Sequence, residues 1–172
     1  MNPKIDLINP SEPGNNTVLV AWSDRYATGI ECIDNQHMQL VILTNKLYQA
    51  CLSNPNEVQS VFGEAMSQMV EYVRFHFTSE LELLKQVNFS GYADHKSQHD
   101  GLVHKIIEAS REYGAGKKFI PNHFVRTLKD WVFGHIAISD KIYSANVFEQ
   151  ERKGLLKINE LTCSVYRPDG KY

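Results

Sequence analysis

The chain has 172 residues, enough for one domain with a sizeable core, and its 18 Lys and Arg nearly balance its 20 Asp and Glu. This balance, without any basic run, argues against nucleic acid or a membrane surface as a partner, and no apolar stretch is long enough to cross a bilayer. The polar N-terminus is unlike a secretory signal, and three cysteines without motif spacing (Cys32, Cys51 and Cys163) suggest reduced thiols, so we expect a cytoplasmic protein.

The N-terminal part of the chain is predicted to be extended. Residues 1–17 are polar and rich in Pro, Asn and Gly, which predicts a flexible arm. Residues 18–22 are mostly apolar, and we expect Trp22 to hold this segment against the rest of the molecule. The first helix is expected to begin with Asp34 as its N-cap and to end near Leu52, before a Ser-Asn-Pro-Asn segment.

Three further helices are predicted over about residues 57–86, 92–113 and 121–152. Glycine-containing turns separate them, and a proline at the start of the last one suits the first turn of a helix. Residues 18–152 are therefore expected to form one helical domain, and residues 153–172 a C-terminal extension or linker.

Each predicted helix carries one inward-facing stripe with steps of three and four residues. Such stripes are typical of helices that pack at a shallow angle, and short loops between four helices predict an all-α, up-down-up-down antiparallel four-helix bundle. The stripes are His37, Leu40, Thr44, Leu47 and Cys51; Phe62, Met66, Met69, Val73, His76 and Glu80; His95, His99, Leu102 and Ile106; and Phe124, Leu128, Trp131, His135, Ile138 and Ile142.

Side chains that can bind metal recur on these stripes at helical spacing. Five imidazoles and two carboxylates suit a pair of first-row metal ions, with iron as the leading candidate and manganese also tolerated. Two of the pairs are four residues apart, so both members project from one face of a helix. The seven candidates are His37, His76, Glu80, His95, His99, His135 and Asp140.

The last pair, His135 and Asp140, is five residues apart and does not share one face of a regular helix. Both side chains reach one centre only if they lean inward or the helix widens locally. We therefore predict a π-type turn between them, a feature often found at functional sites.

Each histidine, considered alone, could be a core or surface residue that binds no metal. Together, seven polar side chains on inward-facing stripes need partners, because unpaired buried polar groups are costly, and metal ligation supplies them all. By their spacing His104, His123 and Glu82 lie off these stripes and are predicted to be surface residues.

The chain resembles the bacterial hemerythrins, which are non-haem di-iron oxygen-binding proteins and include examples of the four-helix bundle. The resemblance runs from about Val18 to about Phe148 and rests on four segments. These are AWSDRYATGIECIDNQHMQL, HFTSE, HKSQH and HIAISD.

The resemblance implies a division of roles among the seven residues. One iron would be held by His95, His99 and His135, and the other by His37 and His76, which leaves it a free position for dioxygen. Glu80 and Asp140 would bridge the two irons together with an oxo or hydroxo group.

Apolar residues near this centre are expected to shield it. Val132, one turn before His135, is the candidate for lining the oxygen pocket, with Trp131, Phe77, Ile136 and Leu40 around it, although all of them also suit plain core packing.

Two further classes of function stay open. One is an oxygen or redox sensor that controls an output domain or protein partner, for which the extensions would be linkers. The other is a di-iron peroxidase, oxidase or nitric-oxide-handling enzyme, which is disfavoured because ferritin-like di-iron enzymes more often use carboxylate-rich sites with Glu-x-x-His spacing.

Overall fold

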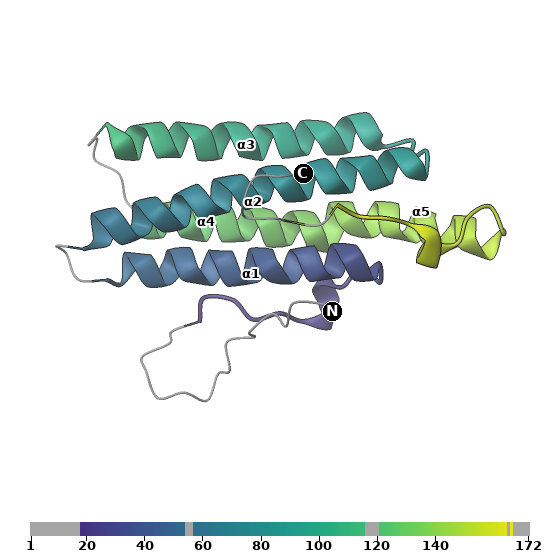
Figure 1. The fold of residues 1–172 in the computed structure, drawn as a ribbon, viewed down its shortest axis with the longest axis horizontal. Helices are drawn as coiled ribbons and strands as arrows, with labels where there is room; N and C mark the ends of the chain where they lie inside the picture. The colour runs from purple at the N-terminus through teal and green to yellow at the C-terminus, as the bar shows by residue number, and fades with distance from the viewer. Residues whose placement is uncertain (1–17, 54–56, 116–120, 165, 167–172) are drawn as a thin grey trace.

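The computed structural model describes residues 18–53, 57–115, 121–164 and 166. Four long helical stretches make up most of these residues. Figure 1 shows these stretches side by side with alternating directions, as an up-down-up-down antiparallel bundle. The described residues contain no strand, so the predicted all-α bundle is confirmed. The main elements are α1 (Glu31–Cys51), α2 (Val58–Gln86), α3 (Tyr92–Gly114), α4 (Pro121–His135), the π-helical turn η2 (Ile136–Asp140) and α5 (Lys141–Arg152), with short 3₁₀ turns η1 (Asp24–Tyr26) and η3 (Ile158–Glu160).

Parts of the predicted terminal regions lie outside the described residues. The flexible arm predicted for residues 1–17 is among them, as are residues 167–172 of the predicted extension. The segment that follows the arm is described. The backbone amides of Leu19 and Val20 both donate to the Asn45 side chain of α1, and Trp22 packs against the main core as predicted.

The start of α1 differs from the prediction. The helix begins at Glu31 with Ile30 as its N-cap, so Asp34 lies within the first turn and not at the cap. Its carboxylate instead accepts hydrogen bonds from the backbone amides of Thr28 and Gly29, at 2.6 and 2.9 Å. An acidic residue in a first turn can reach back to the preceding loop, and Asp34 thereby holds the loop that leads into the bundle.

The interior has two apolar clusters. The larger contains residues such as Leu47, Phe62, Met69 and Val125, and the smaller contains Ile33, Leu83, Leu84, Tyr143 and Val147. His37 on α1 and Glu80 on α2 each lie in the sequence between a residue of the larger cluster and a residue of the smaller one. Polar candidate ligands therefore lie at the boundary between the two apolar clusters.

The stripe predicted for the last helix is wrong beyond His135. Ile138 and Ile142 are 67 % and 61 % exposed, whereas Ile136 and Tyr143 are fully buried. The cause is η2, because a π turn takes more residues than an α turn and rotates every later side chain around the helix axis.

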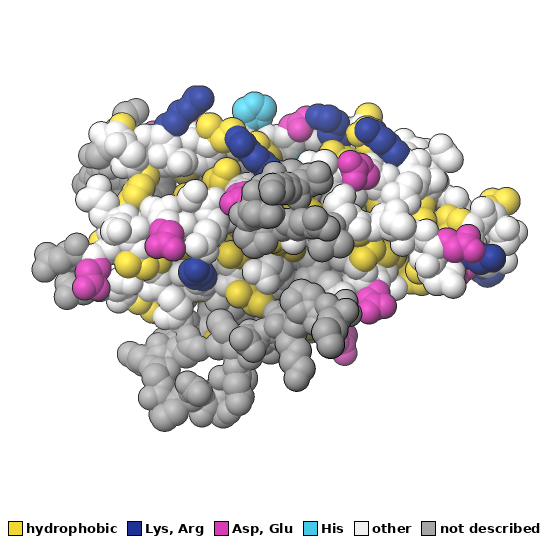
Figure 2. Space-filling view, in the orientation of Figure 1, with side chains coloured by type: hydrophobic (Ala, Val, Ile, Leu, Met, Phe, Trp, Pro, Cys, Tyr) yellow, Lys and Arg dark blue, Asp and Glu magenta, His cyan; other side chains and the backbone are white. Residues whose placement is uncertain are grey.

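Two of the three cysteines are joined by a disulfide, contrary to the prediction of reduced thiols. Cys32 at the start of α1 is bonded to Cys163 in the C-terminal segment, and Cys51 is free. Reduced thiols therefore no longer support the predicted cytoplasmic location. Among the described residues, none of the helices has the length and hydropathy of a membrane span. Figure 2 shows acidic and basic side chains interspersed on the face drawn, without a large patch of one sign.

Candidate metal centre

All seven candidate ligands lie inside the bundle, and none is more than 7 % exposed. One comes from α1, two from α2, two from α3, one from the end of α4 and one from the end of η2. The structure thus brings together side chains that are up to 103 residues apart, from His37 to Asp140.

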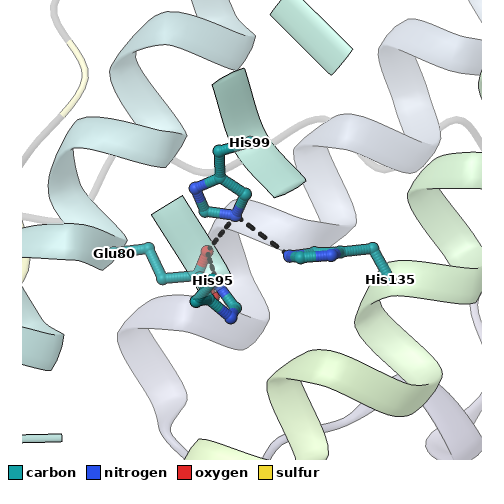
Figure 3. Close-up of side chains that lie close together, drawn as sticks. All are labelled: Glu80, His95, His99 and His135. Carbon is teal, nitrogen blue, oxygen red and sulfur yellow. Dashed lines mark hydrogen bonds and ion pairs between the residues drawn. The ribbon is translucent and has the colours of Figure 1, made fainter. Parts of the chain in front are cut away.

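Three histidines and one carboxylate form the first half of this cluster. Nε2 of His99 lies 3.0 Å from Nε2 of His135, and one Glu80 oxygen lies 3.1 Å from His99 Nε2 and 3.3 Å from His95 Nε2 (Figure 3). Two ligand atoms at right angles on one ion, each about 2.1 Å away from it, are about 3 Å apart. The spacing is therefore that of ligands to a shared ion.

Two histidines form the second half, on the side of α1. The rings of His37 and His76 are 4.9 Å apart, and His76 and Glu80 project from successive turns of α2 with Nε2 and Oε2 separated by 3.9 Å. Ligand atoms of His37, His76 and Glu80 all lie within 4.8 Å of one another. This half offers one imidazole fewer than the first.

The two carboxylates connect the halves. Glu80 belongs to both groups of ligand atoms. One oxygen of Asp140 lies 3.2 Å from His135 Nε2, and the other lies 3.4 Å from Nε2 of His37. Each carboxylate therefore has histidines of both halves within reach.

The predicted π-type turn is confirmed. It covers Ile136–Asp140, and Asp140 is completely buried at its end. With i→i+5 hydrogen bonds, residues five apart come close to the same face, so His135 and Asp140 both point into the bundle.

Several polar atoms in the cluster lack a hydrogen-bond partner within the described part of the chain. They include both ring nitrogens of His37, Oε1 of Glu80 and both carboxylate oxygens of Asp140. Leaving a buried polar group unsatisfied costs about 1–3 kcal/mol, and more for a charged one. These unpaired atoms are imidazole nitrogens and carboxylate oxygens, which are common ligands of first-row metal ions. Metal ions therefore fit this set of donors.

The protonation of the cluster suits metal binding. Burial lowers the pKa of His37 from 6.5 to about 3, and those of His76, His99 and His135 to about 4. For His95 burial acts in the same direction, but the hydrogen bond with Glu80 outweighs it and raises the pKa. Four imidazoles are thus neutral at pH 7, with a lone pair free for a metal.

The two carboxylates differ in their ionisation. Burial acts to raise the pKa of Glu80, but hydrogen bonds with His95 and His99 outweigh it and hold that pKa well below the usual value. Burial, together with the neighbouring charge of Glu80, raises the pKa of Asp140 well above its usual value. Two carboxylates in a dry site repel each other, and bound cations would remove this conflict.

Two glutamines that the ligand pattern did not single out orient the histidines. Gln36 Oε1 lies 2.9 Å from Nδ1 of His76, and Gln98 Oε1 lies 3.0 Å from Nδ1 of His135. If each Nδ1–H donates to the amide oxygen, each Nε2 keeps its lone pair for the metal. Both glutamines directly precede a candidate ligand, and that adjacency was the available signal.

Aromatic and apolar side chains surround the cluster. Phe77 stacks on the His99 ring at 3.6 Å and Trp131 on the His135 ring at 4.7 Å, while Val132 is buried in the main core. The proposed role of Val132 in an oxygen pocket stays a prediction.

The phenol of Tyr143 was not anticipated in this site. It is fully buried, and its hydroxyl has no hydrogen-bond partner among the described residues. Burial and the charges of Glu80 and Asp140 raise its pKa well above 10, so it stays protonated beside the carboxylates.

The residues predicted to lie off the site do so. His104, His123 and Glu82 are all exposed to solvent.

Comparison with known proteins gives a consistent result. The model of the family described as "Hemerythrin HHE cation binding domain" matches residues 28–146. The chain is 28 % identical to a bacteriohemerythrin of Methylococcus capsulatus over 127 residues, 73 % of this chain and 94 % of that protein. A bacteriohemerythrin of Stenotrophomonas maltophilia is 30 % identical over 75 % of this chain and 82 % of its own length.

The fold has a counterpart among solved structures. A wild-type hemerythrin crystal structure superposes with a TM-score of 0.69 and 26 % identity, covering 74 % of this chain and 96 % of that one. The similarity therefore extends over nearly the whole length of that protein, while part of this chain lies outside it.

Proposed function

Because the chain belongs to the hemerythrin HHE cation-binding family, we propose that it binds dioxygen reversibly at a non-haem di-iron centre, for storage, delivery or sensing. His95, His99 and His135 would hold one iron and His37 and His76 the other. Glu80 and Asp140 would bridge them, together with an oxo or hydroxo group. The relatives are named for hemerythrin, and we propose a binding protein and not an enzyme.

One observation carries this proposal, namely the unequal number of histidines in the two halves. Three imidazoles serve the first half and two the second, while both share the carboxylates. An open coordination position is what separates a reactive metal site from a structural one. The side of His37 and His76 is therefore where a small ligand would bind.

The protein's own residues prepare this site in three ways. Four of the buried imidazoles are neutral, and those of His76 and His135 keep Nε2 free because Gln36 and Gln98 accept hydrogen bonds from their Nδ1 atoms. The two carboxylates offset part of the charge of the cations, which lowers the cost of burying them. Phe77, Trp131 and the two apolar clusters exclude water.

Bound ferrous ions would supply the electrons and the Lewis acidity that reversible dioxygen binding needs. The chain contributes an environment in which charged products are poorly solvated, so escape of a reduced oxygen species is disfavoured. The buried hydroxyl of Tyr143 lacks a hydrogen-bond partner among the described residues, and it is suited to donate a hydrogen bond to the carboxylates.

The test is a metal count followed by an optical titration. Protein from iron-replete cells should contain about two irons per chain, the number the two-part cluster predicts. After anaerobic reduction, adding dioxygen should produce a visible charge-transfer absorption that disappears when dioxygen is removed. A centre that oxidises at once, without a lasting oxygenated form, would instead favour a redox sensor or an enzyme.

A matched pair of variants makes the test specific. His37→Ala removes a ligand of the half with the open position, whereas His104→Ala changes an exposed histidine. The first should lose the reversible absorption and the second should keep it. Protein that binds no metal, or an absorption that survives in His37→Ala, contradicts the proposal.

A further inference from the structure

The C-terminal segment beyond the family region returns to the bundle next to the metal centre. Residues 161–164 lie outside the matched region 28–146. Thr162 exchanges two hydrogen bonds with the Gln86 side chain at the end of α2, and Ser164 Oγ donates to Glu82. Figure 1 shows the chain running back from the end of α5 over the bundle.

A covalent bond also fastens this segment. The Cys32–Cys163 disulfide joins it to the first turn of α1 across 131 residues of sequence. Cys163 directly precedes Ser164, and Cys32 lies one turn before Gln36, so the disulfide holds the segment beside the start of α1.

Ser164 contacts Gln36 and Ser79, and Gln36 in turn contacts the metal ligand His76. The carbonyl oxygen of Ser164 accepts from Nε2 of Gln36 at 3.2 Å, and its amide donates to the Ser79 hydroxyl at 3.1 Å. Nε2 of Gln36 also donates to Ser79 Oγ at 2.9 Å. Both N–H bonds of the Gln36 amide are therefore used.

These contacts determine which way the Gln36 amide faces. A carbonyl oxygen only accepts, so Ser164 requires the NH₂ group of Gln36 on its side. The amide oxygen of Gln36 then faces Nδ1 of His76 at 2.9 Å. In the flipped orientation the NH₂ group would face Nδ1 and would stabilise the tautomer that carries its proton on Nε2, the atom needed for metal binding.

We propose that residues 161–164 position the metal ligand His76 from outside the bundle: the Ser164 carbonyl orients the Gln36 amide, which selects the His76 tautomer that binds metal, and the Cys32–Cys163 disulfide keeps the segment in place. Ser164 and Gln36 are positioning residues, because they act through His76. The other half of the cluster has its own glutamine, Gln98, which has no contact with this segment among the interactions described.

The inference rests on the proposed metal centre, but its first test needs no metal. In metal-free protein at neutral pH, the tautomer of each histidine can be measured from its ring ¹⁵N resonances. His135 serves as an internal reference, because Gln98 holds it within the bundle. A failure of oxygen binding would not affect this measurement, so the two proposals fail separately.

The main variant is Cys32→Ser/Cys163→Ser, which removes the cross-link with little change in size. The control is Cys51→Ser, which changes the free cysteine near the end of α1. Exchange of the Ser164 amide reports whether the segment stays docked. In the double variant we expect this exchange to accelerate, and the ratio of the Nδ1–H to the Nε2–H tautomer of His76 to fall about tenfold, with His135 unchanged.

The same variants are then tested with iron. Loss of an outer hydrogen-bond partner typically lowers metal affinity about 10- to 100-fold. We expect a chelator to remove one of the two irons about tenfold faster from the double variant, and both at the wild-type rate from Cys51→Ser. A disulfide that only stabilised the fold would change both irons together, and His76 and His135 together.

A second variant is needed if hydrogen bonds keep residues 161–164 docked after the disulfide has been removed. Ser164→Pro, added to the double variant, removes the amide that donates to Ser79. If the Ser164 amide stays protected in the double variant, the disulfide is not the fastener and that part of the proposal is wrong. If the triple variant leaves the His76 tautomer unchanged, the positioning role is wrong.

A dithiol gives an independent route to the same state. It transfers two electrons and two protons to the Cys32–Cys163 disulfide, forming two thiols, and becomes a disulfide itself. Added to metal-free wild-type protein, it should reproduce the His76 change, and it should have no effect on the double variant. An identical response in both would show that the reagent acts elsewhere.

Discussion

The two halves of the histidine cluster are held in different ways. In the half with three histidines, ring stacking by Phe77 and Trp131 and the side chain of Gln98 all come from the bundle helices. In the half with two, His76 depends on Gln36, whose amide is oriented by the C-terminal segment. The half without an open position is thus supported locally, and the half that would bind dioxygen is supported from a distant part of the chain.

One helical scaffold can therefore orient some ligands from within the bundle and another through a segment docked on its surface. A ligand oriented by its own helices changes only if the bundle changes. A ligand oriented through a docked segment can respond to whatever moves that segment, which is a requirement for sensing.

Removing the shared carboxylate should abolish the difference between the halves. Glu80→Gln keeps the size of the side chain but loses the charge that both groups of ligands use. We expect iron content to fall from about two per chain to nearly none, because a buried cation cluster without its counter-charge is poorly stabilised. Elemental analysis measures this, with the exposed Glu64→Gln on the same helix as control. Retention of one iron would show that one half is independent of Glu80.

Lowering the pH should destabilise the metal-free protein, because both halves of the cluster contain buried neutral histidines. The unfolded chain protonates its histidines as the pH falls through 6.5, while folded His37, His76, His99 and His135 resist down to about 3 or 4. Stability should therefore fall between pH 6.5 and 4, by at most about 1.4 kcal/mol per pH unit for each such histidine. His95 and Asp140, whose pKa values are raised, act in the opposite direction and reduce the slope.

Urea unfolding at several pH values measures this slope. His37→Asn should flatten this slope by the share of one histidine, because it removes one buried neutral imidazole. Stability that is constant or rises on acidification to pH 4.5 would contradict the burial of neutral imidazoles.

Removing the hydrogen bond that supports His135 should lower the affinity for the iron of the three-histidine half and leave the other iron unchanged. Gln98→Ala removes the acceptor for His135 Nδ1, and we expect the affinity for one iron to fall about 10- to 100-fold. Competition with a chelator measures this, with the exposed neighbour Ser97→Ala as control and Gln98→Glu, which keeps an acceptor, as rescue. Equal weakening of both irons would mean that the halves are not supported separately.

The smallest effect is expected at a residue that the helical pattern assigned to the core. Ile138→Ser should change the free energy of unfolding by less than about 0.5 kcal/mol, because the side chain is 67 % exposed. Ile136→Ala, at a buried position two residues earlier, should cost about 2–5 kcal/mol. Thermal or urea unfolding distinguishes them, and similar losses at both would argue against the π turn.

Much of the site was accessible from the sequence because helices have a fixed period. Steps of three and four residues predicted that His76, Glu80, His95 and His99 face inward, and all four are buried. The same period failed beyond His135. The π turn there rotates Ile138 and Ile142 to the surface, and a stripe with the regular helical period does not include that rotation.

The contacts of the C-terminal segment could not be predicted in this way. Ser164 has no periodic relation to Gln36, which is 128 residues away, and its contact uses the backbone carbonyl, which every residue has. The Cys32–Cys163 pair likewise had no motif spacing. Contacts between distant segments depend on how the chain is packed, so local patterns do not identify them.

Local periodicity and ligand chemistry predicted the four helices, their inward faces except beyond His135, and the set of side chains that could hold a pair of metal ions. The division of the histidines into unequal halves was implied by the family resemblance, whereas the outer residues that orient them and the fastening of the C-terminal segment beside His76 emerged only from the folded chain. Hydrogen-bond direction, burial and the pKa of each group depend on neighbours that folding brings from distant positions in the chain, and local patterns do not contain those neighbours.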